Sequence, residues 1–281
     1  MKILITGGKG MLGRTLRAAL AEHTLAIADL PETDITEPRS IHAAFAEFRP
    51  EAVIHCAAMT AVDKCESEAD LAYRVNAIGS ANVGVCCHRH HARLLALSTD
   101  YVFSGALDRP YHEWDAPGPR TVYGASKLAG EEAIRAHCPD HVIARTAWLY
   151  GPGGPSFLHT MLKLGVQAGE PLNVVNDQIG NPTSTAAVAQ ALKDLLRIPW
   201  AGTFHLSCEG EATWYQFAQA IFSARGLKRP VVPCSTAEFP RPAPRPANSR
   251  LEKRALRLCN LAPMPHWQES LSRFLREYPQ G

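Results

Sequence analysis

Short apolar runs alternate with helical patterns through the first half of the chain. Five runs are apolar along their length and predict strands: KILIT at 2–6, TLAIAD at 24–29, AVIHCA at 52–57, RLLALS at 93–98 and HVIART at 141–146. Between them, Pro38 stands where the first turn of a helix accepts proline. Continuous apolar strands separated by helices predict a parallel sheet that is covered on both faces. We therefore expect an α/β fold with a Rossmann-like, doubly wound parallel sheet.

The pattern changes after residue 150, where GPGGPS interrupts the alternation and proline and glycine become frequent. The elements expected there are helices at 156–168, 185–197 and 213–226, strands at 171–177 and 203–207, and an amphipathic helix at 267–278. Residues 230–248 carry many prolines and predict an ordered loop over a site. We expect a dinucleotide-binding domain over 1–150 and a smaller, mainly substrate-binding C-terminal lobe over 151–281, with crossing of the chain between them allowed.

Composition and charge narrow the class of protein. Hydrophobic residues make up 46% of the 281 residues and charged residues 20%, as is usual for a soluble globular enzyme. The net charge of +2 gives no reason to expect a nucleic acid or a membrane surface as a partner. The apolar start, MKILITGG, is too short for a signal peptide, and no stretch approaches the roughly 20 apolar residues of a membrane span. We expect a cytoplasmic protein that is a monomer or a homodimer.

The cysteines and histidines do not form a metal-binding pattern. No CxxC pair occurs among the eight cysteines, so a zinc site is not expected. The run HRHH at 88–91 lacks a second ligand cluster and is better explained as a polar helix end before the strand at 93–98. We therefore expect no metal site.

A glycine loop follows the first predicted strand directly. Gly7, Gly10 and Gly13 form GxxGxxG, and the first helix begins within this segment. Glycine permits the tight turn and the close approach of a pyrophosphate, and the helix N-terminus presents its positive dipole end to the phosphates. This strand, loop and helix predict a dinucleotide site at Gly7, Gly10, Met11, Leu12 and Gly13.

Two acidic residues follow where the adenosine half of a dinucleotide would lie. Asp29 closes the second strand, 22 residues after Gly7, and can accept hydrogen bonds from the ribose hydroxyls. Its charge would repel a 2′-phosphate, although Lys9 and Arg14 lie near enough to offset that repulsion. We expect NADPH or NADH, with the preference open. Asp34 is equally well explained as a partner of the adenine amino group or as a turn cap.

The segment YGASK provides the candidate catalytic pair. Tyr123 and Lys127 stand four residues apart, which places them on one face of a helix. The fourth strand ends in STDYVF, so Ser98 or Thr99 would sit where ligands bind in an open parallel sheet. A ketone that accepts a hydride also needs a proton, and an adjacent ammonium would lower the phenol pKa from its usual value near 10. Lys127 could also bind the nicotinamide ribose. An inert pair on a binding fold remains the alternative.

GGKGMLG, STDYVF and YGASK together resemble the extended short-chain dehydrogenase/reductase superfamily. Five further blocks, in their order along the chain, resemble the dTDP-4-dehydrorhamnose reductase family within that superfamily. They are CAAMTAVDKCESE, VNAIGSANV, RTAWLYG, NDQIGNPT and RPANSRL. The resemblance covers nearly the whole chain. It implies NAD(P)H-dependent reduction of the 4-keto group of dTDP-4-dehydro-L-rhamnose to dTDP-L-rhamnose, with a tyrosine as proton donor. Two alternatives stay open: a C4-epimeric reductase that makes dTDP-6-deoxy-L-talose, and a non-catalytic regulatory subunit resembling that of methionine adenosyltransferase.

The same resemblance assigns roles to individual residues. Thr99, Tyr123 and Lys127 match the catalytic trio of the family. The stretch that lines the cofactor after the third strand corresponds to Ala57, Ala58 and Thr60. The residues on the substrate side are Asp100, Tyr101, Trp148, Gln178, Gly180, Pro182, Arg245, Asn248 and Ser249.

Some of these assignments have simpler structural explanations, and one feature of the family is missing. Arg245 would clamp the diphosphate, because a guanidinium fork pairs with phosphate oxygens, or it could be a solvated loop charge. Trp148 could belong to the core. Asn76 could hold a water or a backbone carbonyl near the site, as the resemblance implies, or it could be a packing residue with satisfied hydrogen bonds. RTLRAAL and STAAVAQAL lack the carboxylates that some family members use for a divalent ion and a dimer contact. Their absence argues against a metal there and against that mode of dimerisation.

Overall fold

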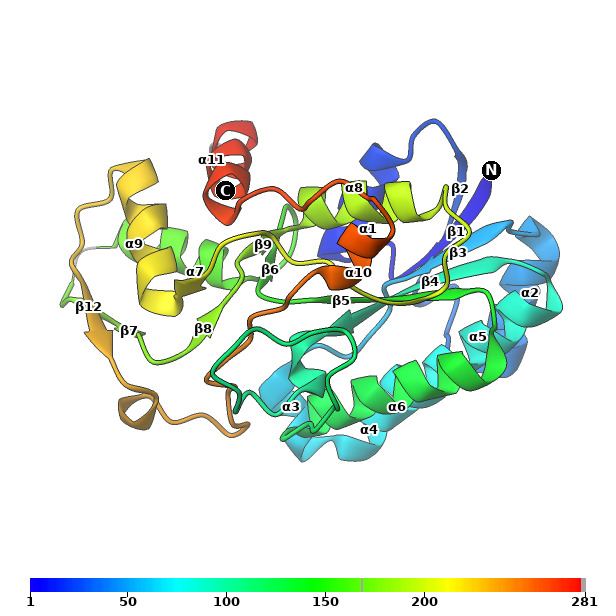
Figure 1. Cartoon of the computed structure of the whole chain (residues 1–281), viewed down its shortest axis with the longest axis horizontal. Coiled ribbons are helices and arrows are strands. Elements are labelled where there is room, and N and C mark those ends of the chain that lie inside the picture. The colour runs from blue at the N-terminus through cyan, green and yellow to red at the C-terminus, as the bar shows by residue number, and fades with distance from the viewer. Residues whose placement is uncertain (168, 279–281) are drawn as a thin grey trace.

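The computed structural model describes residues 1–167 and 169–278 of the chain. Its centre is a six-stranded sheet in the order β10-β5-β4-β3-β1-β2, with every neighbouring pair parallel (Figure 1). The strands are β1 (Lys2–Thr6), β2 (Thr24–Ala28), β3 (Ala52–His55), β4 (Arg93–Thr99), β5 (His141–Thr146) and β10 (Gly202–His205). The strand order reverses between β1 and β3, as it does in a doubly wound fold.

Helices cover both faces of this sheet, which confirms the predicted α/β class (Figure 1). One face packs against α1 (Met11–Ala19) and α8 (Thr185–Leu195), and the other packs against α2 (Pro38–Phe48), α5 (Ser80–Arg89) and α6 (Val122–His137). Successive residues of a strand point to opposite faces. In β1, Ile3 and Ile5 therefore join the first core, and Leu4 joins the second. This two-sided burial explains why the strands are apolar along their whole length.

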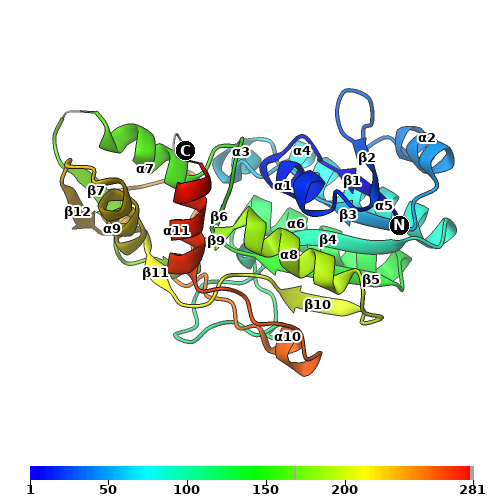
Figure 2. The same cartoon turned by 90° about the horizontal axis from the view of Figure 1, so that it is seen from above.

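A smaller lobe lies beside the sheet, away from β2 (Figures 1 and 2). Its helices are α7 (Phe157–Gly165), α9 (Trp214–Arg225) and α11 (Trp267–Glu277), which contacts α9. Three short strand pairs complete it: β7 (Leu172–Val175) with β12 (Val231–Cys234), β8 (Ile179–Gly180) with β11 (Ala212–Thr213), and β6 (Leu149–Tyr150) with β9 (Thr183–Ser184). The helix α10 (Arg254–Leu258) packs near β10. The chain crosses between the two parts, since β10 and α8 belong to the sheet and its cover.

Several boundaries differ from the predictions. Residues 230–248 include the strand β12 rather than loop alone. Among the described residues β12 pairs with β7 alone, so Pro233 fits there because its missing N–H is not needed for a second ladder of hydrogen bonds. The second and third strands end at Ala28 and His55, so Asp29 and Ala57 lie in loops. The helix predicted over 156–168 ends at Gly165, and Ala168 lies outside the described residues.

Six short helical segments were not predicted as separate elements. They are α3 (Val62–Ser67), α4 (Ala69–Tyr73), a π-helix (Arg74–Gly79), two 3₁₀ turns (Asp100–Val102 and Thr236–Glu238) and α10. Within the two ranges that the structure describes, no helix is both long and apolar enough to cross a membrane.

Candidate active site

A cavity of about 650 Å³ opens at the carboxyl ends of the parallel strands. It begins at the glycine loop, passes the loop after β3, and reaches the ends of β4 and β5 and the start of α6. All of the predicted cofactor-binding and catalytic residues line this one cavity. They are Gly7, Gly10, Met11, Leu12, Gly13, Asp29, Asp34, Ala57, Ala58, Thr60, Thr99, Tyr123 and Lys127. Its volume is typical of small-molecule sites.

The glycine loop has the geometry that a pyrophosphate requires. Gly7 adopts a φ of +64°, and a Cβ there would lie 2.6 Å from the Ala57 nitrogen, so only glycine fits. A Cβ on Gly13 would come within 2.5 Å of the Gly8 Cα, which explains the close packing of α1 against the loop. No side chain caps the N-terminus of α1 at Gly10. The first amide groups of the helix are therefore left for an anion, and the loop fits a dinucleotide.

The adenosine end of the cavity carries acidic groups. The Asp29 carboxylate accepts hydrogen bonds from the Lys9 and Leu30 amides, each at 2.8 Å. The Lys9 ammonium, which was expected to offset repulsion of a 2′-phosphate, donates to Glu32 Oε2 at 2.7 Å. Asp34 Oδ1 accepts from the Thr36 amide at 2.8 Å, which is the turn-cap arrangement, although Asp34 also lines the cavity.

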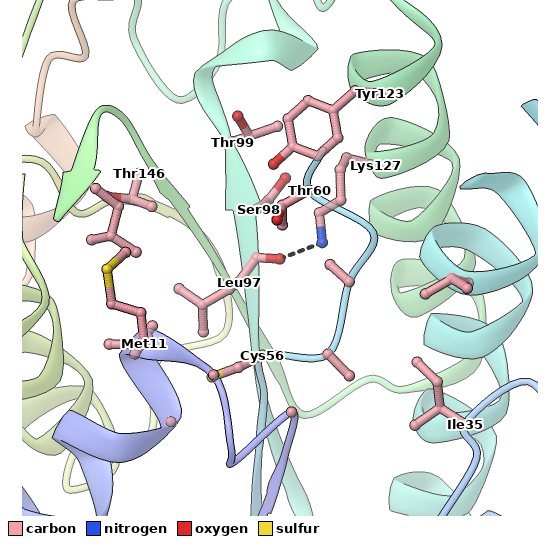
Figure 3. Close-up of a pocket in the computed structure, with 18 of the residues that line it drawn as sticks. Met11, Ile35, Cys56, Thr60, Leu97, Ser98, Thr99, Tyr123, Lys127 and Thr146 are labelled. Carbon is pink, nitrogen blue, oxygen red and sulfur yellow. Dashed lines mark hydrogen bonds between the residues drawn. The ribbon is translucent and has the colours of Figure 1, made fainter. Parts of the chain in front are cut away.

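At the other end, Figure 3 shows Thr99, Tyr123 and Lys127 on one wall, with Met11 and Thr146 across from them. Lys127 is 6% exposed, and its ammonium donates to the Leu97 carbonyl at 2.7 Å. Burial lowers the pKa of Lys127 to about 8.

The Tyr123 phenol differs from its predicted state. Burial raises the pKa of Tyr123 above its usual value, opposed by a hydrogen bond with Thr99. The lowering that we predicted from Lys127 is absent, because desolvation dominates and the ammonium is bonded to the Leu97 carbonyl. A phenol with a raised pKa is protonated at neutral pH, and a proton donor must start in that state.

Two buried polar atoms in the cavity have no hydrogen-bond partner among the described residues. They are Asp100 Oδ2 and Thr146 Oγ1. Asp100 Oδ1 accepts from the Thr99 hydroxyl at 3.1 Å, and burial raises the pKa of Asp100 to about 6. Buried polar groups are seldom left unpaired, so these atoms fit a polar ligand. We did not predict Thr146, although it ends a parallel strand, the same signal that identified Thr99.

A buried ion pair, also unpredicted, supports the catalytic wall. Glu131 on α6 and Arg145 on β5 are each 2% exposed and meet through two hydrogen bonds of 2.8 and 2.6 Å. Glu131 also accepts from the Ser98 hydroxyl at 2.6 Å. Glu131 stands one turn after Lys127, and Ser98 directly precedes Thr99. The pair therefore sets α6 against β4 and β5.

Asn76, in the π-helix, has a packing arrangement. Its Oδ1 accepts from the Met59 amide at 2.8 Å, and its Nδ2 donates to Ser126 Oγ at 3.0 Å. It is fully buried and ties the loop after β3 to α6. Its Nδ2 also donates to the Met59 carbonyl at 3.1 Å, so Asn76 holds a backbone carbonyl near the site, one of the two roles that the sequence left open.

On the substrate side, Tyr101 and Trp148 reach the cavity. The Tyr101 ring meets the Tyr123 ring edge to face, with centroids 5.5 Å apart. Trp148 has a φ of +48°, which is uncommon for a bulky residue, and it stacks on Trp214 at 3.4 Å. A Cβ on Gly180 would lie 2.4 Å from the Trp148 indole. Gly180 therefore makes room for Trp148 rather than lining the cavity.

Two predicted substrate residues have amide groups that are occupied within the protein. Gln178 donates to Thr236 Oγ1 at 2.9 Å and accepts from Trp214 Nε1 at 3.0 Å. Asn248 Nδ2 donates to the carbonyls of Leu107 and Arg109 at 2.8 and 2.7 Å. In this structure both side chains hold loops together, and their direct contact with a substrate stays a prediction.

The remaining predicted residues, Pro182, Arg245 and Ser249, are outside the lining of this cavity. Pro182 and Ser249 are buried, and Ser249 partly opposes the rise in the pKa of Asp100 that burial causes. Arg245 lines a neighbouring cavity of about 200 Å³. Tyr101 lines both cavities, so the two are adjacent.

Comparison with known proteins agrees with this geometry. The family model described as the RmlD substrate binding domain matches residues 1–280. The chain is 42% identical to the dTDP-4-dehydrorhamnose reductase of Streptomyces griseus, over 96% of this chain and 91% of that protein. It is 40% identical to the spore coat polysaccharide biosynthesis protein SpsK of Bacillus subtilis, over 98% of this chain and 97% of that protein.

The fold of this chain is also similar to that of a solved reductase. The crystal structure of dTDP-4-dehydrorhamnose reductase from Bacillus anthracis in complex with NADP superposes with a TM-score of 0.96 at 41% identity, covering 98% of this chain and 99% of that one. The family match, the full-length relatives and the predicted blocks agree. The chain belongs to the RmlD family, that of the dTDP-4-dehydrorhamnose reductases.

Proposed function

We propose that this protein reduces the 4-keto group of dTDP-4-dehydro-L-rhamnose to give dTDP-L-rhamnose, with NADPH or NADH as the reductant. The observation that carries the proposal is the convergence of Thr99, Tyr123 and Lys127 in the cavity that also contains the glycine loop. Full-length similarity to reductases of this name supports the substrate class.

The glycine loop and Lys127 would hold the reduced nicotinamide cofactor, which would supply a hydride for the ketone carbon. The residues of the chain act on the ketone oxygen. Thr99 and Tyr123 hydrogen-bond the ketone oxygen, where negative charge develops. Tyr123 donates its phenolic proton to that oxygen, acting as a general acid. Lys127, one turn along α6, is held by the Leu97 carbonyl and presents its ammonium to the nicotinamide ribose in the same cavity. Trp148 and Tyr101 pack against the sugar, and Arg245 binds the diphosphate.

The main proposal and its epimeric alternative, which makes dTDP-6-deoxy-L-talose, differ in which face of the ketone receives the hydride. A relative from Streptomyces antibioticus, 42% identical, is a probable dTDP-4,6-dihydroxy-2-methyloxan-3-one 4-ketoreductase. The family thus includes reductases named for another keto sugar, and product identification is essential. The regulatory-subunit alternative has less support, because the RPANSRL segment, which the resemblance assigns to the sugar nucleotide, is intact.

The test is a cofactor-consumption assay with dTDP-4-dehydro-L-rhamnose, run separately with NADPH and NADH. We expect the absorbance of the reduced cofactor to fall only when the keto sugar is present. The coupling between H3 and H4 in the product NMR spectrum then assigns the C4 configuration. Copurification of a partner enzyme without keto-sugar turnover would instead support the regulatory alternative.

We further propose that residues 1–150 mainly hold the cofactor and 151–281 mainly the dTDP-sugar. We expect the protein to act in the cytoplasm as a monomer or a homodimer. Light scattering at assay concentrations measures that oligomeric state.

A further inference from the structure

Asp63 and Arg245 join the two parts of the site across 182 residues of sequence. Asp63 lies in the first turn of α3, just after the segment that lines the cofactor cavity (Figure 1). Arg245 lies in the proline-rich stretch after β12. Arg245 Nη1 donates to Asp63 Oδ1, and Nη2 donates to Oδ2, each at 2.8 Å. The Ala243 amide also donates to Asp63 Oδ1, at 3.1 Å, which fixes the loop to α3.

A count of the Arg245 donors shows what this arrangement leaves available. A guanidinium has five N–H groups in a fixed plane. Two of them face Asp63, and a third, on Nη1, donates to the Ala243 carbonyl at 2.8 Å. Over residues 1–167 and 169–278, the N–H of Nε and the second N–H of Nη2 have no protein acceptor. These two donors form the other edge of the fork, a geometry that pairs with two phosphate oxygens.

Arg245 lies beside the catalytic cavity, where its two remaining N–H groups are suited to a diphosphate. Arg245 and Arg120 both line the 200 Å³ cavity, and Tyr101 separates that cavity from the catalytic trio. A sugar at Tyr123 would therefore have its attached diphosphate within reach of a side chain that is already held in place.

We propose that Asp63 is a positioning residue for the diphosphate of the dTDP-sugar. It holds one edge of the Arg245 guanidinium and leaves the opposite edge for phosphate oxygens. The inference rests on the proposed function, in which Arg245 binds the diphosphate. Its physical basis is preorganisation, because an arginine that is fixed before binding loses less side-chain freedom when the ligand arrives.

A second effect of Asp63 has the opposite sign and makes the proposal testable. Its carboxylate repels a phosphate, so a purely electrostatic role would weaken binding of the ligand. Removal of Asp63 therefore weakens dTDP binding if positioning dominates and strengthens it if repulsion dominates.

Isothermal titration of the full chain with dTDP measures this sign without requiring turnover. We expect dTDP to bind Asp63→Ala roughly two- to tenfold more weakly, from the loss of one ordered side chain. Asp63→Asn, which keeps the shape and one acceptor oxygen, should lie between Asp63→Ala and the wild type. Glu68→Ala is the matched control, since it removes a carboxylate near α3 that pairs with Lys64 rather than with Arg245. Thermal melting and NADPH titration of each variant show whether the fold and cofactor site are intact.

The double variant separates this inference from the function on which it rests. In an Arg245→Ala background, Asp63→Ala should cause no further weakening, because there is no guanidinium left to position. Unchanged or tighter dTDP binding by Asp63→Ala, with Arg245→Ala still weakened, would overturn the positioning role alone. Unchanged dTDP binding by Arg245→Ala would overturn the diphosphate role of Arg245, and the positioning role with it.

Discussion

Replacement of Glu131 by glutamine tests whether the buried ion pair behind the catalytic wall has the role that its geometry implies. The substitution keeps the shape of the side chain and removes its charge. Arg145 would then remain buried opposite an amide, with a weak hydrogen bond to the Glu113 carbonyl at 3.4 Å and the Phe103 ring 4.9 Å away. Neither contact neutralises a guanidinium that is 2% exposed.

The expected cost follows from this burial. Removal of one partner from a buried ion pair typically destabilises a protein by about 3–5 kcal/mol, because the other charge is left uncompensated. We expect about 3 kcal/mol for Glu131→Gln, since the amide oxygen retains one acceptor. That loss would lower the melting temperature by roughly 6–12 °C in a chain of this size.

The pH dependence of unfolding provides an independent check on the same pair. Burial alone would raise the pKa of Glu131, but its hydrogen bonds and the charge of Arg145 hold that pKa below the ordinary value of 4.5. A carboxylate with a depressed pKa contributes stability above its unfolded-state pKa and loses it as the pH falls through the folded-state value. The wild type should therefore lose this contribution at pH values below about 4.5, and Glu131→Gln should lack that part of the acid sensitivity.

Urea unfolding followed by circular dichroism measures both effects. Glu132→Gln is the matched control, because Glu132 is exposed on the same helix. A free energy of unfolding for Glu131→Gln within about 1 kcal/mol of the control would refute the assigned role, since surface substitutions usually stay within that range.

Three further predictions concern the cavity itself. Burial lowers the pKa of Lys127 to about 8, so its ammonium loses a proton as the pH rises through that value. We expect kcat/KM to decline there, and a kcat/KM that stays constant well above pH 8 would contradict this. Glu32→Gln should raise the NADPH-to-NADH ratio of kcat/KM roughly two- to fivefold. The exposed Lys9 ammonium keeps its hydrogen bond to the Leu30 carbonyl but loses its carboxylate partner, so its charge is available to a 2′-phosphate. An unchanged ratio would exclude that contribution. Gly180→Ala should displace Trp148, because the added Cβ would lie 2.4 Å from its indole. We expect KM for the dTDP-sugar to rise and KM for NADPH to stay unchanged. Unaltered tryptophan fluorescence and an unaltered KM for the dTDP-sugar would show that Gly180 does not hold the indole in this way.

The sequence was sufficient for features that depend on local spacing. The glycine loop, the polar residues at strand ends and the four-residue separation of Tyr123 and Lys127 each depend on one element and its neighbour. Parallel strands bring those ends together at one edge, so the cofactor and catalytic predictions all meet in one cavity.

Other features depend on which side chains of distant elements face each other. Glu131 and Arg145 are ordinary charged residues in the sequence, and only the packing of α6 against β5 makes them a pair. Gln178 and Asn248 looked like binding residues because of their motifs, but their amide groups are bonded to other loops. The state of the Tyr123 phenol was also unpredictable, since desolvation outweighs the charge of Lys127.

The central claim is that this cavity reduces a 4-keto sugar nucleotide with Tyr123 as the proton donor. The most direct measurement compares wild type and Tyr123→Phe for oxidation of NADPH by dTDP-4-dehydro-L-rhamnose, with dTDP binding and melting temperature as controls for folding. We expect wild type to form dTDP-L-rhamnose in step with NADPH consumption and Tyr123→Phe to lose about 10²–10⁴-fold in kcat, the usual contribution of a general acid. Full activity of Tyr123→Phe, or no oxidation of NADPH by the wild type with this sugar, would contradict the account.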